Sequence, residues 1–175
     1  MLNTGGHLAL ATALEFTPDG RHLVVGSEDK VLRIWNTHTG ELSQTFRGQA
    51  GQGSYGATKA IALSPDGRWL AAGGSFGPAG SRDLGDIRLY DLSTGQIEKL
   101  LEGHTDSVTA LRFSADGRYL ASGSWDKQTI IWDIETGQPI RTIHAHSHVV
   151  TAVDFSADGR LALSAARNPR RVLWY

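Results

Sequence analysis

The chain has 175 residues, enough for one domain with its own hydrophobic core. Its formal net charge is −1 and it has no cysteine, which excludes disulfides and thiolate metal sites and argues against a strongly basic, nucleic-acid-binding surface. No apolar run approaches the ~20 residues of a membrane-spanning helix, and the first residues do not resemble a signal peptide. We therefore expect a cytoplasmic protein that binds neither nucleic acid nor membrane.

A five-residue turn phrase recurs four times along the chain. It reads TPDGR at 17–21, SPDGR at 64–68, SADGR at 114–118 and SADGR at 156–160. An alternating run precedes each phrase (LATALEF, ATKAIAL, VTALRF, VTAVDF) and another follows it (HLVVGS, WLAAGGS, YLASGS, LALSAA). Asp-Gly between two such runs is a strong β-hairpin signal, because glycine accepts the positive φ of the turn. Each phrase therefore predicts two antiparallel strands.

A third alternating run follows each hairpin: VLRIWN at 31–36, DIRLYD at 86–91, TIIWDI at 129–134 and RRVLWY at 170–175. Thr-Gly turns ending at Gly40, Gly95 and Gly137 then lead to fourth short runs. Helical periodicity and helix caps are missing. The sequence therefore predicts an all-β chain built from units of four antiparallel strands.

These units resemble WD repeats, the blades of β-propellers. The third unit carries the resemblance best, with GH at 103–104, SADG at 114–117, ASGSWD at 121–126 and IIWD at 130–133. The shortest spacing between Asp-Gly pairs, 42 residues, matches the ~40–45 residues of such blades. The resemblance implies a single WD-repeat domain over residues 1–175, with repeats at about 6–47, 48–102, 103–144 and 145–175.

The chain contains strands for four blades, but it begins with a fourth strand and ends with a third strand. Repeat 4 contains three strand-like runs, whereas residues 1–5 align with 98–102, the end of a fourth strand. Rings of this family usually close with seven or eight blades, and closure hides edge strands. We therefore expect a homodimer that forms one eight-bladed ring, in which residues 1–5 of each subunit complete repeat 4 of the other. An open fragment and a four-bladed monomeric ring are the alternatives.

Blades of this family contain a buried hydrogen-bond chain from histidine through a hydroxyl and an aspartate to tryptophan. The resemblance assigns this structural network to His104, Ser122, Asp126 and Trp132 in repeat 3, and to His146, Ser164, Asn168 and Trp174 in repeat 4. Repeat 1 has Val25 at the hydroxyl position, and repeat 2 has Ala72 there. Because the hydroxyl lies inside a blade, out of reach of a substrate, we interpret the set as structural and assign no catalytic residues.

Two further motifs resemble ligand sites. His144, His146 and His148 have the period-2 spacing that places three imidazoles on one strand face. However, His146 belongs to the network, and the segment spans a strand end and a loop. The glycines at 51, 53 and 56 match a dinucleotide-binding pattern, but a strand-like run follows them where that site needs a helix. We therefore assign no metal and no cofactor.

The narrow top face of such propellers often serves as a docking surface. The resemblance places on it Leu8, Leu10, Glu28, Tyr55, Thr105, Ser107, Trp125, Val149 and Arg167. Trp125 is the strongest candidate, because tryptophan in an exposed turn is typical of interface hot spots. We predict a non-catalytic scaffold that binds a protein or peptide partner on this face. The alternatives are a ligand-binding or enzymatic propeller that uses the central channel, and a repeat fragment of a larger sensor protein.

Overall fold

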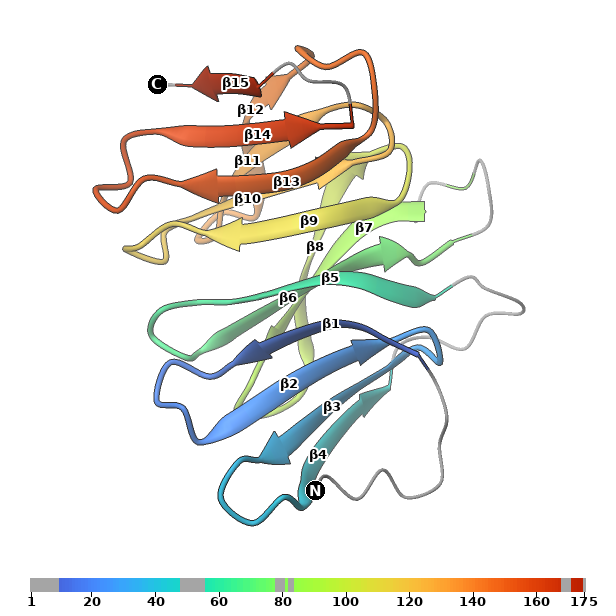
Figure 1. Ribbon diagram of the computed structural model, residues 1–175, viewed down its shortest axis with the longest axis vertical. Helices are drawn as coiled ribbons and strands as arrows, with labels where there is room; N and C mark the ends of the chain where they lie inside the picture. The colour runs from blue at the N-terminus through green and yellow to red at the C-terminus, as the bar shows by residue number, and fades with distance from the viewer. Residues whose placement is uncertain (1–9, 48–55, 78–80, 82–83, 168–170, 175) are drawn as a thin grey trace.

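The computed structural model describes residues 10–47, 56–77, 81, 84–167 and 171–174 of the chain, the last four as backbone alone. Within them, fifteen strands form four antiparallel sheets in chain order, here called blades 1 to 4 (Figure 1). The all-β prediction is therefore confirmed. The strand expected at residues 1–5 lies outside the described residues. No helix in the described part of the chain is long and apolar enough to cross a membrane.

Each blade is a meander of consecutive strands. Blade 1 contains β1 (Ala11–Phe16), β2 (His22–Ser27), β3 (Val31–Asn36) and β4 (Leu42–Arg47), and blade 2 contains β5 (Ala57–Leu63), β6 (Trp69–Ser75), β7 (Gly85–Asp91) and β8 (Ile97–His104). Blade 3 contains β9 (Val108–Phe113), β10 (Tyr119–Ser124), β11 (Thr129–Asp133) and β12 (Gln138–Ile143), and blade 4 contains β13 (Val150–Phe155), β14 (Ala162–Ala166) and β15 (Arg171–Trp174).

The recurrent turn phrase forms the same hairpin connection in every blade. In blade 1, Asp19 accepts hydrogen bonds from the Thr17 hydroxyl at 2.6 Å and from the Arg21 amide at 3.0 Å. Gly20 follows with φ of +69°, the left-handed region that favours glycine. The hydroxyl hydrogen bond lowers the pKa of Asp19 and keeps the carboxylate charged. Local chemistry therefore fixes these turns, and with them the strand register.

The first strands of consecutive blades lie side by side, β1 next to β5, β5 next to β9 and β9 next to β13. Apolar clusters fill the spaces between blades 1 and 2, between 2 and 3, and between 3 and 4. Figure 1 shows the four blades fanned out, with blade 1 at one end and blade 4 at the other. The end faces of the fan belong to these two blades.

A glycine faces a β-branched residue at each of the three junctions between blades. A β-carbon added at Gly26 would lie 2.8 Å from Thr58 Cγ2, one at Gly73 would lie 2.6 Å from Val108 Cγ1, and one at Gly123 would lie 2.5 Å from Val150 Cγ1. Each separation is far below carbon–carbon contact distance, so each glycine allows the backbone of one blade to approach the next.

A threonine hydroxyl also ties blades together at two of these junctions. Thr109 Oγ1 of blade 3 donates to the Val150 carbonyl of blade 4 at 2.6 Å. Thr12 Oγ1 of blade 1 donates to the Thr58 carbonyl of blade 2. These two junctions therefore combine one close steric contact with one specific hydrogen bond.

The glycine contact predicts a measurable coupling between blades 3 and 4. We expect Gly123→Ala to destabilise the fold by about 1–3 kcal/mol, because the added methyl overlaps the γ-methyl group of Val150. The double variant Gly123→Ala/Val150→Ala should be destabilised by less than the sum of the two single variants, because it removes that overlap. Urea unfolding at one fixed chain concentration measures all four free energies. Strict additivity would contradict the proposed contact.

Candidate functional site

One end of the blades carries most of the residues that the sequence predicts for docking. The Glu28 amide donates to the Leu10 carbonyl at 3.1 Å, the Trp125 amide to Ser107 at 3.0 Å, and the Arg167 amide to Val149 at 3.1 Å. In each case the turn after the second strand is bonded to the segment that enters the first strand. This repeated hydrogen bond brings six of the nine predicted docking residues to equivalent places in blades 1, 3 and 4.

Trp125 and Lys59 form the centre of this end. The Trp125 side chain is 47% exposed, and Lys59 Nζ lies 4.3 Å from the centroid of its ring. Burial lowers the pKa of Lys59, whereas the charges of Asp106 and Glu28 act to raise it. The ring of blade 3 and the cation of blade 2 are thus in contact, and the charges of Asp106 and of Glu28 in blade 1 act on that cation. We call Glu28, Lys59, Asp106 and Trp125 the top cluster.

The other predicted docking residues differ in accessibility. Leu10 is 68% exposed, Glu28, Thr105 and Arg167 are exposed, and Val149 is half-buried. Leu8 and Tyr55 lie outside the described residues. The prediction that Ser107 is a docking residue is wrong, because Ser107 is 2% exposed and its hydroxyl lies 2.7 Å from that of Ser75. Ser107 therefore connects blades 2 and 3 and cannot present its side chain to a partner.

Sequence reasoning missed Lys59 and Asp106. Lys59 occupies the first-strand position that holds Thr12, Thr109 and Thr151 in the other blades. A lysine where the other repeats have threonine was the sequence feature that could have marked Lys59 as a candidate site residue. Its position over a tryptophan 66 residues later in the chain depends on how two blades pack, which no local pattern encodes.

His104, at the end of β8 of blade 2, meets the three residues of blade 3 that the resemblance assigns to the same network. His104 Nδ1 lies 2.8 Å from Asp126 Oδ2, and its Nε2 lies 2.7 Å from Ser122 Oγ. Trp132 Nε1 donates to the same Ser122 oxygen at 2.8 Å. Ser122 and Trp132 are fully buried, and His104 is 2% exposed. Because the serine hydroxyl is enclosed, it is inaccessible to a substrate despite its histidine and aspartate neighbours.

Blade 4 shows part of the equivalent network. His146 Nε2 lies 2.7 Å from Ser164 Oγ, and both residues are buried. Burial lowers the pKa of His146, which favours the neutral imidazole. Asn168 and the Trp174 side chain lie outside what the structure describes. His144 and His148 are exposed, so the period-2 histidine run does not place three imidazoles on one face.

Arginines take the place of this network in blades 1 and 2, where Arg33 is half-buried and Arg88 is buried. In blade 1, Arg33 forms a bidentate ion pair with Asp29, with Nη2–Oδ2 at 2.6 Å and Nη1–Oδ1 at 3.1 Å. The Arg33 hydrogen bonds lower the pKa of Asp29 to about 2. In blade 2, Ala72 offers no hydroxyl, and the Arg88 guanidinium lies 4.1 Å from the centroid of the Phe76 ring. Blades 1 and 2 thus differ from each other, and among the described residues both lack the histidine–serine hydrogen bond that occurs at blades 3 and 4.

Charged residues also gather where the first strands end, opposite the top cluster. Arg112 Nε donates to Asp154 at 3.1 Å, and Glu15 accepts the Leu63 amide at 3.0 Å. Burial raises the pKa of Glu15, against the effects of the Leu63 amide and the Arg112 charge. These groups line a depression with the hairpin turns of blades 1 to 4. The Glu15–Leu63 hydrogen bond joins blades 1 and 2, and the Arg112–Asp154 pair joins blades 3 and 4.

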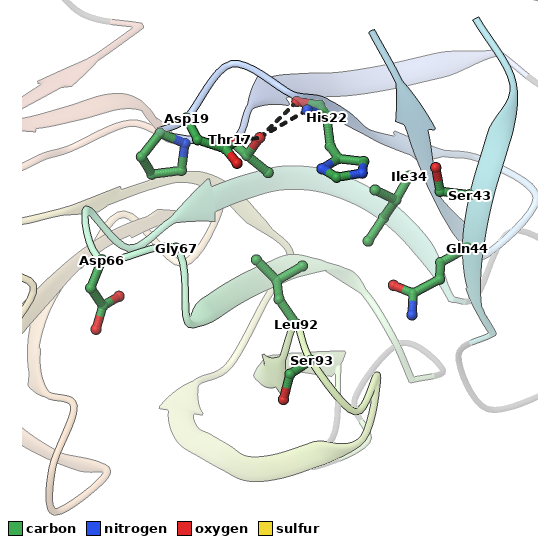
Figure 2. A pocket seen from close by; sticks show the side chains of 11 residues that line it. Thr17, Asp19, His22, Ile34, Ser43, Gln44, Asp66, Gly67, Leu92 and Ser93 are labelled. Atoms are coloured by element: carbon green, nitrogen blue, oxygen red, sulfur yellow. Dashed lines mark hydrogen bonds between the residues drawn. The ribbon is translucent and has the colours of Figure 1, made fainter. Parts of the chain in front are cut away.

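A groove lies between blades 1 and 2 at the same end (Figure 2). It is lined by the hairpin turns of both blades, by residues of β2, β3 and β4 of blade 1, and by the turn after β7 of blade 2, with Thr17, His22, Ile34, Gln44 and Leu92 among its walls. The Thr17 hydroxyl is engaged by Asp19 and by the His22 backbone, as Figure 2 shows for the latter. Among the described residues, no group of three or more histidine or carboxylate side chains is placed to hold a metal ion.

The buried serine of blade 3 gives a direct test of the network. We expect Ser122→Ala to destabilise the fold by about 1–3 kcal/mol for each of the two groups it orphans, His104 Nε2 and Trp132 Nε1. Ser43→Ala, at an exposed serine of β4, should change the free energy of unfolding by less than about 0.5 kcal/mol. Urea unfolding compares the two. Similar small losses in both variants would show that the Ser122 hydroxyl does not bridge these groups.

Comparison with known proteins places this architecture in a family. The family model described as "WD domain, G-beta repeat" matches residues 2–36, 40–91, 95–133 and 137–168. The target of rapamycin complex subunit wat1 of Schizosaccharomyces pombe is 32% identical over 69% of this chain and 35% of the relative. A guanine nucleotide-binding protein subunit beta of Arabidopsis thaliana is 35% identical over 73% of this chain and 33% of the relative.

The nuclear distribution protein PAC1 of Coccidioides posadasii is 35% identical over 73% of this chain and 28% of that protein. The matched part of the chain thus corresponds to about a third of each of these relatives. The four matched segments cover nearly all of this chain, and they are shifted by one strand from the blades: residues 40–91, for example, contain β4 of blade 1 followed by β5, β6 and β7 of blade 2. The chain belongs to the WD-repeat family.

Proposed function

We propose that this protein is a non-catalytic interaction scaffold that binds a peptide or protein segment on the top cluster. The observation that carries the proposal is the half-exposed Trp125 ring with Lys59 placed over it. A large aromatic surface held by a cation, with carboxylates beside it, combines apolar area and directional polar groups. Such a combination is typical of interface hot spots.

The residues around Trp125 and Lys59 support a binding role and not a catalytic one. The charges of Glu28 and Asp106 both act on Lys59, and Thr105 and Arg167 are exposed at the same end. Mixed charge around an aromatic anchor suits a polar rim around a hydrophobic contact. The serine of the His104–Ser122–Asp126 set is enclosed within blade 3, so the set supplies no accessible nucleophile.

The relatives support a role in assemblies. Two of them are named as subunits, one of a target of rapamycin complex and one of a guanine nucleotide-binding protein. Because this chain matches about a third of each relative, we take from them the general role of a protein that binds other proteins, and no individual partner.

The proposal includes a homodimer in which two copies form one eight-bladed ring. Within the described residues, the four blades form an open fan, and no further blade lies against either end face. β1 on one of these faces exposes Leu14 to 65% and Phe16 to 58%. Covering such faces with further blades removes apolar surface from water and protects sheet edges. Two copies related by a twofold axis cover both kinds of face at once.

Peptide selection tests the docking surface and does not require an identified partner. A displayed library of random peptides is selected on the purified chain, and the enriched peptides are titrated against Trp125→Ala, Trp125→Phe and Leu100→Ala. We expect Trp125→Ala to weaken binding by about 30-fold or more, as for an interface hot spot, and Trp125→Phe to weaken it less. Leu100, 50% exposed on β8, is the matched apolar control and should leave affinity unchanged.

The selection has two outcomes that would contradict the proposal. One is enrichment of peptides that bind the wild-type chain and Trp125→Ala equally well, which would place the docking surface elsewhere. The other is a selection that yields no peptide above background on the folded chain, which would leave the top cluster without a binding role.

A further inference from the structure

The end faces of the fan carry residues that depart from the rule seen at the internal junctions. Strand pairing shows which positions correspond: Gly26, Gly73 and Gly123 pair with Ala13, Ala60 and Ala110 on their own first strands, and Ala165 of blade 4 pairs with Ala152 in the same way. The position that is glycine in blades 1, 2 and 3 is therefore alanine in blade 4.

The position on the first strand that faces this glycine is smaller in blade 1 than in the other blades. Thr58, Val108 and Val150 are the β-branched residues that contact those glycines. Their counterpart on blade 1 is Ala11, which pairs with Ser27 as Val108 pairs with Ser124 and Val150 with Ala166. Blade 4 has thus gained a methyl group where the other blades have glycine, and blade 1 has lost the γ-methyl group that would meet it.

We propose that Ala165 of one copy packs against Ala11 of a second copy, so that blade 4 and the second copy's blade 1 form the junction that closes the ring. This inference rests on the homodimer proposed above and identifies its contact residues. A β-carbon at residue 165 would overlap a valine or threonine in the internal geometry, where γ-carbons lie 2.5 to 2.8 Å away. Alanine at residue 11 removes that obstacle.

The alanine pair also sets the spacing of the junction. In the internal geometry a β-carbon at the glycine position lies 2.8 to 3.3 Å from the facing β-carbon. Two alanines therefore fit once the blades separate by a few tenths of an ångström. A contact between two chains has the freedom to take this slightly wider spacing.

Apolar surface on blade 1 matches this contact. Leu14 corresponds to Leu111 of blade 3, which is 9% exposed because blade 2 covers it, whereas Leu14 is 65% exposed. Phe16 corresponds to Phe113, and the exposed fractions are 58% and 6%. On the other end face, Leu161 and Leu163 of blade 4 are half-exposed. Both faces therefore gain burial from the same junction that the internal blades already make.

The junction also completes the pattern of threonine hydrogen bonds. Thr12 and Thr109 each donate to a carbonyl of the next blade. Thr151, their counterpart in blade 4, donates to Ala165 in its own blade at 3.3 Å and has no inter-blade acceptor among the described residues. The corresponding carbonyl on blade 1 is that of Ala11. A second copy thus supplies the acceptor that Thr151 lacks.

Like charges at the ends of the first strands, opposite the top cluster, would oppose this junction. By the same correspondence, Glu15 of the second copy would stand near Asp154. Asp154 is already paired with Arg112 at 3.1 Å, and both side chains are more than half exposed. Water and salt screen such exposed charges, so the repulsion is small beside the burial of Leu14 and Phe16.

A residue swap tests the contact by sedimentation velocity over a dilution series of the full chain. We expect the wild-type chain to be a dimer of twice 18.9 kDa. A11V should raise the dimer dissociation constant by about 100-fold, because overpacking costs roughly tenfold at each of two junctions. The double variant A11V/A165G recreates the Gly123–Val150 pairing and should restore dimerisation to within about threefold of the wild-type value.

Controls separate the contact from general effects. Ala11 is exposed in the single chain, so A11V should keep the wild-type circular dichroism spectrum. Ile140→Ala, at an exposed position of β12 outside this junction, should leave the dimer unchanged. A monomeric wild-type chain, a dimer indifferent to A11V, or a double variant as weak as A11V would each overturn the proposal.

The same variants keep this inference distinct from the proposed docking role. Lys59 and Trp125 come from neighbouring blades of one chain, so a monomeric A11V should still bind peptides selected on the top cluster. Loss of peptide binding in Trp125→Ala with an intact dimer concerns docking alone. Dimer loss with intact peptide binding concerns the junction alone.

Discussion

Close packing of the second strand of one blade against the first strand of the next is the constraint on which this structure depends. The first strands can lie side by side only because a glycine stands opposite each β-branched side chain. This contact fixes the spacing between blades and, with it, the curvature of the fan. At two of the junctions a backbone carbonyl also accepts a hydrogen bond from a threonine hydroxyl of the preceding blade. This hydrogen bond is directional, so it restricts the relative position of the two blades more than the steric contact alone.

The candidate site is a consequence of that spacing. Trp125 belongs to a turn of blade 3 and Lys59 to the first strand of blade 2, and they meet because the two blades are held at this distance. The Ser75–Ser107 hydrogen bond also joins these two blades. The polar network of His104, Ser122, Asp126 and Trp132 crosses the same junction, because His104 ends β8 of blade 2 and the other three residues belong to blade 3. By contrast, the Asp29–Arg33 ion pair acts within blade 1.

The sequence predicted what local chemistry decides. Asp-Gly turns and alternating runs define hairpins within about ten residues, so the strands and their order followed directly from residues such as Asp19 and Gly20. The resemblance predicted which end of the blades we now propose for docking, but it could not predict the accessibility of the residues there. Ser107 is buried because blade 2 lies against it, and Lys59 reaches Trp125 across a junction. Both facts depend on contacts between segments distant in the chain, which a residue pattern does not encode.

The central claim is that two chains close one ring through blade 4 of one copy and blade 1 of the other. The chain contains no native cysteine, so A11C/A165C offers a clean cross-link, and the proposed contact brings the two β-carbons within the range of a disulfide. The most direct measurement is the mass of the oxidised variant under denaturing, non-reducing conditions. The account predicts a covalent dimer of twice 18.9 kDa. An oxidised species that stays at the mass of one chain, with its two thiols joined internally or left free, would contradict it.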